Sequence, residues 1–283
     1  MKTCWLIGGT SDSAEIARRL SARSIPYVVT VTTPAARNLY PTEAQVEVGK
    51  LSPQTALAFV RQHQVGYIAD ASHPFASEIS NCAIALAQNH HIPYLRYERP
   101  AIAPSPTSDA TVIDVDSIEQ LANSSLLKHQ RVLFTIGYRH LSKFAHLRQT
   151  SKLYARVLPS QRAIVGSLAA GFSPEEIIAL RPPVSLALEI ALWQQWNISC
   201  VVSKASGQLV SSLLSPVDKT DKKVNKKTNY QANASGEQVK RQAADRLGIQ
   251  LVLIHRPAIT YPQKTEHIED VLLFCAEMLS QFS

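Results

Sequence analysis

The chain has 283 residues, 45% of them hydrophobic and 18% charged, with a formal net charge of +7. That length suits two domains of roughly 100 to 150 residues each. No apolar run reaches the ~20 residues of a membrane helix, and two glycines interrupt the apolar start too early for a signal sequence, so we expect a cytoplasmic protein that does not bind membranes. Four widely spaced cysteines predict reduced thiols and no metal site: Cys4, Cys82, Cys200 and Cys275.

The chain opens with a predicted strand at residues 3–7, a glycine turn, and a helix at about 13–20. In mononucleotide-binding folds, such a turn lets the backbone approach a pyrophosphate, and the helix amides meet its charge. The full G-x-G-x-x-G pattern is absent, so turn geometry alone is an alternative reason for the glycines. The candidate cofactor-binding residues here are Gly8, Gly9, Thr10, Ser11 and Asp12.

The second predicted strand, at residues 26–33, lacks the acidic residue that binds the ribose hydroxyls of NAD. Thr32, Thr33 and Arg37 stand there instead, which favours the 2′-phosphate of NADPH, although an exposed loop position also explains Arg37. A short strand at 44–48 follows, then a further candidate cofactor loop and a helix at 53–63. That loop contains Gly49, Lys50 and Leu51.

The stretch from Ile68 to Ser80 has the richest chemistry. A buried strand ends there, Pro74 suits the start of a helix that runs to about His90, and a polar set lies between them: Asp70, Ser72 and His73. Ligands bind at this edge of open α/β sheets, so these side chains are expected to orient a cofactor amide or carry a proton. Ordinary helix capping is the alternative. A strand at 92–95 closes this half.

Three sequence blocks recur in the same order. Residues 200–207 repeat the strand and the charge-Ala-Ser pattern, with Lys204 in place of Asp70; residues 249–259 resemble 92–102; and residues 133–137 resemble 5–9. This duplication predicts two similar halves with a ligand between them. We therefore expect an α/β fold of two Rossmann-like domains with mainly parallel sheets, the active site in the cleft between them, and domains at 1–100 and 101–283.

Within the second half, residues 101–109 read as a linker, and strands are expected at 111–115, 131–134 and 153–158. Helices are expected from Ser117, from Ser173, over 184–196 and over 267–282. Trp193 and Trp196 are more typical of core packing than of a ligand-stacking platform.

Residues 208–235 are rich in Ser, Lys, Asn and Thr without periodicity, which predicts a disordered insertion. A solvated loop is the expected role, with a mobile lid as the alternative. Five lysines and two aspartates give this segment +3, so the rest of the chain carries about +4. No basic stripe interleaved with aromatic residues is present, so we expect an anionic small ligand and no nucleic acid.

Several motifs together carry a family resemblance: Gly8-Gly9-Thr10, Gly49-Lys50-Leu51, Asp70-Ala-Ser-His-Pro-Phe-Ala76, Pro93-Tyr-Leu-Arg-Tyr-Glu-Arg-Pro100, Thr135-Ile-Gly137, Lys204-Ala-Ser-Gly207 and Arg256-Pro257. The chain resembles the precorrin-6A reductase family of corrin biosynthesis, including its cobalt-precorrin-6A branch. The resemblance implies a two-domain α/β reductase that uses NADPH to reduce one double bond of a tetrapyrrole carrying many carboxylates. Two positions depart from the family pattern: Gln208, where a second glycine is common, and the strand end Thr32-Thr33-Pro34.

This reading assigns the remaining candidate residues. Reduction also takes a proton, for which position suggests Asp70, His73 and Lys204. Ser72 is placed with the cofactor, and the expected substrate-binding residues are Arg96, Arg99, Gly137, Tyr138, Arg139, Ser206, Gly207 and Arg256. Alternatively, each Arg-Pro pair merely ends a strand, its arginine bound to a local acid such as Glu98.

Two other functions remain open at this point. A cofactor-free tetrapyrrole lyase or cyclase would also use duplicated halves, but it would not need two glycines before a helix. A non-catalytic NADP-sensing module would leave the basic residues as surface charges. Either a monomer or a small homo-oligomer is compatible with the sequence.

Overall fold

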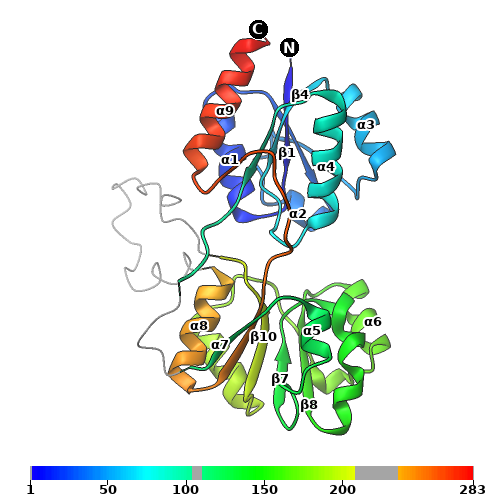
Figure 1. The fold of residues 1–283 in the computed structure, drawn as a ribbon, viewed down its shortest axis with the longest axis vertical. Helices are drawn as coiled ribbons and strands as arrows, with labels where there is room; N and C mark the ends of the chain where they lie inside the picture. Colours follow the sequence, from blue (N-terminus) through cyan, green and yellow to red (C-terminus); the bar gives the residue numbers. More distant parts are fainter. Residues whose placement is uncertain (1, 104–109, 208–234, 283) are drawn as a thin grey trace. The chain divides into compact units, whose positions relative to one another are not determined.

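The computed structural model describes residues 2–103, 110–207 and 235–282. The chain divides into two compact units, one made of Met1–Pro100 with Pro257–Ser283 and the other of Ala101–Arg256. Each unit is built on a six-stranded sheet whose paired strands all run parallel, with helices packed on it (Figure 1). The predicted α/β class with two Rossmann-like domains is confirmed.

The first unit alternates strands and helices, and its sheet has the order β12-β5-β4-β1-β2-β3. Its elements are β1 (Thr3–Ile7), α1 (Ser11–Ala22), β2 (Tyr27–Val31), α2 (Pro34–Arg37), β3 (Gln45–Val48), α3 (Pro53–Gln62), β4 (Val65–Asp70), α4 (Ser77–His90), β5 (Tyr94–Tyr97), β12 (Lys264–Thr265) and α9 (Ile268–Gln281).

The second unit has the order β6-β11-β10-β7-β8-β9, which matches the first strand for strand. Its elements are β6 (Val112–Val115), α5 (Ile118–Ala122), β7 (Arg131–Phe134), the 3₁₀ helix η1 (Tyr138–Gln149), β8 (Lys152–Val157), α6 (Gln161–Ala169), η2 (Pro174–Glu176), β9 (Ile177–Ala179), α7 (Leu186–Gln195), β10 (Cys200–Lys204), α8 (Gly236–Leu247) and β11 (Gln250–Ile254). The sequence repeats coincide with equivalent strands, because β1, β4 and β5 correspond to β7, β10 and β11.

The two halves exchange their sixth strands. Strand β6 follows β5 along the chain but pairs with β11, and β12 follows β11 but pairs with β5. Helix α9 then packs beside α1 on the first sheet (Figure 1). The expected second domain, residues 101–283, is therefore corrected: residues 257–283 belong to the first unit. Only two residues of β12 pair with β5, too few to give a strand signal in the sequence.

The core of the first unit lies between its sheet and the helices. Strands β1 and β4 are buried along nearly their whole lengths, as expected for parallel strands covered on both faces. Trp5 and Ile68 are fully buried and pack with Phe59 of α3 and Ala83 of α4. Trp193 belongs to the core of the second unit and Trp196 packs against it, which confirms their predicted packing role.

Some local predictions were wrong. Helix α4 begins at Ser77 rather than at Pro74, because residues 73–76 form a turn closed by a hydrogen bond from the Ala76 amide to the His73 carbonyl. The predicted helix at Ser173 is one 3₁₀ turn that leads into β9. Helices α2 and α6 were not expected.

Two expectations concern membranes and the insertion. Among the described residues, no helix combines the length and apolarity needed to cross a membrane. The predicted insertion at 208–235 lies outside the described residues, apart from Ser235, which caps α8.

The packing of α9 on the first sheet allows a test of whether the carboxyl-terminal segment belongs to the first unit. Leu272 is fully buried, whereas its neighbour Leu273 is 59% exposed. Leu272→Ala should lower the free energy of unfolding by about 2 to 5 kcal/mol, and Leu273→Ala should change it little. Hydrogen exchange should accelerate in β4 and β5 but not in β10 and β11. Faster exchange confined to the second unit would contradict the assignment of α9.

Candidate active site

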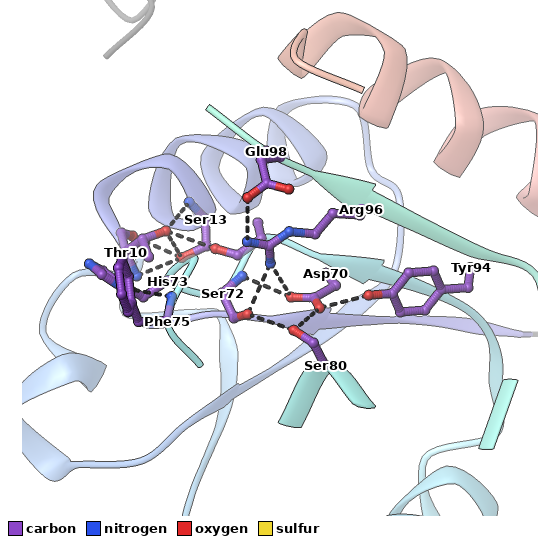
Figure 2. A network of polar contacts seen from close by, with 11 residues as sticks. Thr10, Ser13, Asp70, Ser72, His73, Phe75, Ser80, Tyr94, Arg96 and Glu98 are labelled. Carbon is purple, nitrogen blue, oxygen red and sulfur yellow. Dashed lines mark hydrogen bonds and ion pairs between the residues drawn. The ribbon is translucent and has the colours of Figure 1, made fainter. Parts of the chain in front are cut away.

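A buried carboxylate organises the carboxyl edge of the first sheet. Asp70 ends β4 and is fully buried. Its Oδ1 accepts hydrogen bonds from the Ser72 amide (3.0 Å) and Arg96 Nη1 (2.9 Å), and its Oδ2 accepts from Ser80 Oγ and Tyr94 Oη, both at 2.7 Å (Figure 2). Four donors thus saturate the Asp70 carboxylate, and they come from the turn after β4, from the neighbouring strand β5 and from helix α4.

The charge of this carboxylate follows from its partners. Burial by itself would raise the pKa of Asp70, but the Arg96 guanidinium and the hydroxyls of Ser80 and Ser72 outweigh it and hold that pKa below its ordinary value. Asp70 is therefore ionised at neutral pH and has no proton to donate. Arg96 is only 1% exposed and also donates to Ser72 Oγ at 3.0 Å. These contacts fit a structural ion pair better than the catalytic and substrate-binding roles expected of Asp70 and Arg96.

The structure contradicts the capping alternative for this motif. The N-cap of α4 is Ala76, and no side chain caps that helix. Asp70 and Ser72 therefore serve a purpose other than starting α4. His73 lies in the intervening turn, is exposed, and its Nδ1 accepts a hydrogen bond from the Phe75 amide at 3.2 Å.

The glycine turn lies next to this motif, at the end of β1. Gly9 has φ +102°, a conformation that favours glycine, and Thr10 caps α1 with a capping box that involves Ser13. Thr10 Oγ1 donates to the Ala71 carbonyl at 2.9 Å, which joins the turn to the Asp70 motif. The first amides of a helix have no carbonyl within the helix, and they attract anions. A glycine turn followed by a helix start is thus present where the sequence predicts one.

The structure brings Arg99 to the same turn. Its guanidinium forms an ion pair with Asp12 and donates to Ser11 Oγ at 3.2 Å. Burial raises the pKa of Asp12, and Arg99 opposes that shift. Arg99 was expected to bind substrate, but its partners are two of the predicted cofactor residues.

The other predicted cofactor residues follow β2 and β3. Thr32, Thr33 and Arg37 are exposed, and Arg37 Nη1 donates to the Val46 carbonyl at 3.1 Å. Lys50 pairs with Glu78 at 2.5 Å. Gly49 and Leu51 line a cavity of about 290 Å³ between β3 and α3.

In the second unit, a predicted substrate residue lies at or just after the end of each of three neighbouring strands. Lys204 ends β10, Gly137 (φ +87°) follows β7, and Arg256 follows β11, where its Nε donates to the Ala205 carbonyl at 3.1 Å. Burial, and then the charge of Arg139, lower the pKa of Lys204. The predicted substrate residues of this unit therefore lie along one sheet edge.

The remaining residues of this edge belong to its loops. Ser206 is half-buried, Gly207 is buried and donates its amide to Glu237 Oε2 at 2.8 Å, and the Tyr138 ring lies against Gly166.

Sequence analysis missed four residues that hold these loops: Tyr40, Ser80, Tyr94 and Glu237. Tyr94 lies inside the Pro93–Pro100 block, so its position was available as a signal. Tyr40 and Glu237 are distant in sequence from the loops that they contact, and their residue types carry no signal of that contact.

Comparison with known proteins gives the family. Residues 3–212 match the family model described as precorrin-6x reductase CbiJ/CobK. The chain belongs to this family of oxidoreductases of cobalamin biosynthesis. The family recognised from the motifs is thus confirmed.

Relatives of this family align over the whole chain. A cobalt-precorrin-6A reductase from Synechocystis sp. is 40% identical over 99% of this chain and 98% of its own length. A second one, from Priestia megaterium, is 31% identical over 94% of this chain and 95% of its own. The solved structure of CobK precorrin-6A reductase has the same fold, with a TM-score of 0.75 over 98% of both chains at 19% identity.

The Asp70 network predicts a pH effect on stability. Because the pKa of Asp70 is lowered on folding, its contribution is present above the unfolded pKa of about 3.9 and is lost as the pH falls through the folded pKa. Asp70→Asn should cost about 3 to 5 kcal/mol of unfolding free energy at pH 7, since it leaves the buried Arg96 without its nearer counter-ion and only Glu98, at 3.9 Å, in its place. This cost should shrink as the pH falls below about 4, as measured by urea denaturation.

A matched variant controls for loss of charge alone. Asp116 is 82% exposed, so Asp116→Asn should change the unfolding free energy by less than about 0.5 kcal/mol. An Asp70→Asn cost that stayed constant from pH 7 to pH 3 would show that the buried charge is not its cause.

Proposed function

We propose that this reductase uses NADPH to reduce one double bond of precorrin-6A, or of its cobalt-containing form, giving the 6B form. The observation that supports this best is that two candidate ligand-binding motifs follow neighbouring strands of the first sheet. The glycine turn after β1 and the Asp70 motif after β4 lie where the strand order reverses, the usual place for a ligand in an open α/β sheet. The relatives named above supply the substrate class.

The residues of the first unit fit an NADPH site. The cofactor, when bound, supplies the hydride. The amides that open α1 and the Arg99 guanidinium bind its diphosphate, and Thr32, Thr33 and Arg37 bind its 2′-phosphate. Asp70 and Arg96 hold β4, β5 and α4 together beneath this site, so their role is to position Ser72 and His73.

The residues of the second unit fit an anionic substrate. Lys204, Arg139 and Arg256 give the edge of its sheet a positive charge, and the substrate's carboxylates need several cationic partners. Proton transfer is left to His73 or Lys204, because Asp70 is ionised. A lyase without cofactor would leave the glycine turn without a use.

Turnover tests this function. Purified protein should oxidise NADPH only when precorrin-6A or its cobalt form is added, as followed by the loss of NADPH fluorescence and by mass analysis of the product. NADPH should be preferred to NADH. NADPH binding without turnover of either substrate would instead favour a sensor.

The Arg37→Ala variant tests the 2′-phosphate contact. It should raise KM for NADPH and leave the use of NADH nearly unchanged. If the wild type used both nucleotides equally well, the assignment of Thr32, Thr33 and Arg37 would be wrong.

Lys204 and Arg99 should separate substrate from cofactor binding. Lys204→Ala should lower kcat/KM for the tetrapyrrole roughly tenfold to 150-fold, which corresponds to a loss of about 1.5 to 3 kcal/mol of transition-state stabilisation. The Kd for NADPH should stay unchanged. Arg99→Ala should have the opposite pattern, with a raised Kd for NADPH. A Lys204→Ala enzyme that lost only NADPH affinity would move Lys204 to the cofactor site.

A further inference from the structure

Tyr40 lies behind the glycine turn, although it comes from the segment between α2 and β3. It is 8% exposed, and its Oη accepts a hydrogen bond from the Gly9 amide at 2.6 Å and lies 2.7 Å from Ser13 Oγ. Ser13 Oγ donates to the Thr10 carbonyl at 2.8 Å, so Tyr40 donates to Ser13. One directed chain of hydrogen bonds therefore runs from Gly9 through Tyr40 and Ser13 to Thr10.

This chain explains why residue 8 is glycine. A Cβ at Gly8 would lie 2.2 Å from Tyr40 Oη and 2.8 Å from Val29 Cγ1, both too close. The tyrosine hydroxyl thus occupies the space beside the turn and engages the Gly9 amide. Burial raises the pKa of Tyr40, so its hydroxyl keeps its proton and can donate.

Tyr40 is also tied to the opposite end of the expected nucleotide site. Its backbone amide donates to the Arg37 carbonyl at 3.1 Å, and Arg37 in turn donates from Nη1 to the Val46 carbonyl. A single residue therefore connects the turn expected to bind the diphosphate with the residue expected to bind the 2′-phosphate.

In the second unit, a different kind of contact anchors the turn that follows the equivalent strand, β7. There the ring of Tyr138, which follows Gly137 after β7, lies against Gly166 of α6: a Cβ at Gly166 would be 2.3 Å from Tyr138 Cδ2. Ring packing thus connects the turn and the crossover helix in that half, where η1 replaces the α-helix. The polar connection through Tyr40 belongs to the half with the nucleotide-type turn.

We propose that Tyr40 is a positioning residue that sets the spacing between the glycine turn and Arg37, and thereby favours a dinucleotide with a 2′-phosphate. This inference rests on the proposed use of NADPH. A nucleotide held at both ends depends on that spacing, whereas one held only by its diphosphate does not. Tyr40 acts through Gly9 and Arg37 and takes no part in the reaction itself.

Binding of NADP⁺ and NAD⁺ by calorimetry tests the inference without turnover. Tyr40→Phe keeps the ring but removes the hydroxyl. It should weaken NADP⁺ binding about fivefold to tenfold, the scale of one neutral hydrogen bond, and NAD⁺ binding less than about twofold. The kcat at saturating NADPH should stay within about twofold of the wild-type value.

Tyr27→Phe is the matched control, because Tyr27 Oη lies 2.7 Å from Ser21 Oγ in the same unit but away from the turn. It should leave both affinities unchanged. Ser13→Ala is a second probe of the chain and should reproduce the selective loss of NADP⁺ affinity. Melting temperatures measured in parallel identify any variant that loses affinity by unfolding.

The outcomes separate this inference from the function on which it rests. Unchanged NADP⁺ affinity in Tyr40→Phe, or an equal loss for NADP⁺ and NAD⁺, would overturn the spacing role while leaving the use of NADPH intact. A wild-type protein that bound neither nucleotide would overturn both. A selective loss of NADP⁺ affinity in Tyr40→Phe, absent in Tyr27→Phe, would support the inference.

Discussion

The buried ion pair between Asp70 and Arg96 is the constraint on which the first unit depends. An ionised carboxylate is costly to bury unless donors surround it, and here the turn after β4, helix α4 and strand β5 each supply at least one donor. Tyr261, from the returning carboxyl-terminal segment, lies 5.2 Å from the Arg96 guanidinium. Four segments thus meet at one charge pair, which holds the sheet edge below the glycine turn in a single arrangement.

Because of the pairing of β6 and β12, two segments of the chain connect the two units. The second unit is one continuous segment, whereas the first needs residues 257–283 from beyond it, so the chain passes from one unit to the other twice. Arg99 and Arg256 lie next to these two passages, and each binds a loop of its own unit. Each Arg-Pro motif therefore follows a strand and lies where the chain crosses to the other unit. Its arginine also binds a candidate ligand loop.

The two sheets place similar loops in equivalent positions but give them different chemistry. After β1, a glycine turn leads into an α-helix whose first turn contains Asp12, paired with Arg99; after β7, Gly137 leads into a 3₁₀ helix that begins with Tyr138 and Arg139. At the next strand along, Asp70 is neutralised by Arg96, whereas Lys204 lies beside the further positive charge of Arg139. This difference supports the proposal that the first edge binds the nucleotide and the second binds a substrate with several carboxylates.

The sequence alone determined the α/β class, the duplication, the family and most strands, because buried parallel strands read as apolar runs and motifs such as Asp70-Ala-Ser-His-Pro persist in order. Only the tertiary structure decided which side chains meet. Asp70 and Arg96 are 26 residues apart, so nothing local distinguished a catalytic acid from half of a buried ion pair. Tyr40 reaches Gly9 across 31 residues, and β12 pairs with a strand from the other end of the chain. Each of these contacts depends on how separate elements pack, which local propensity does not encode.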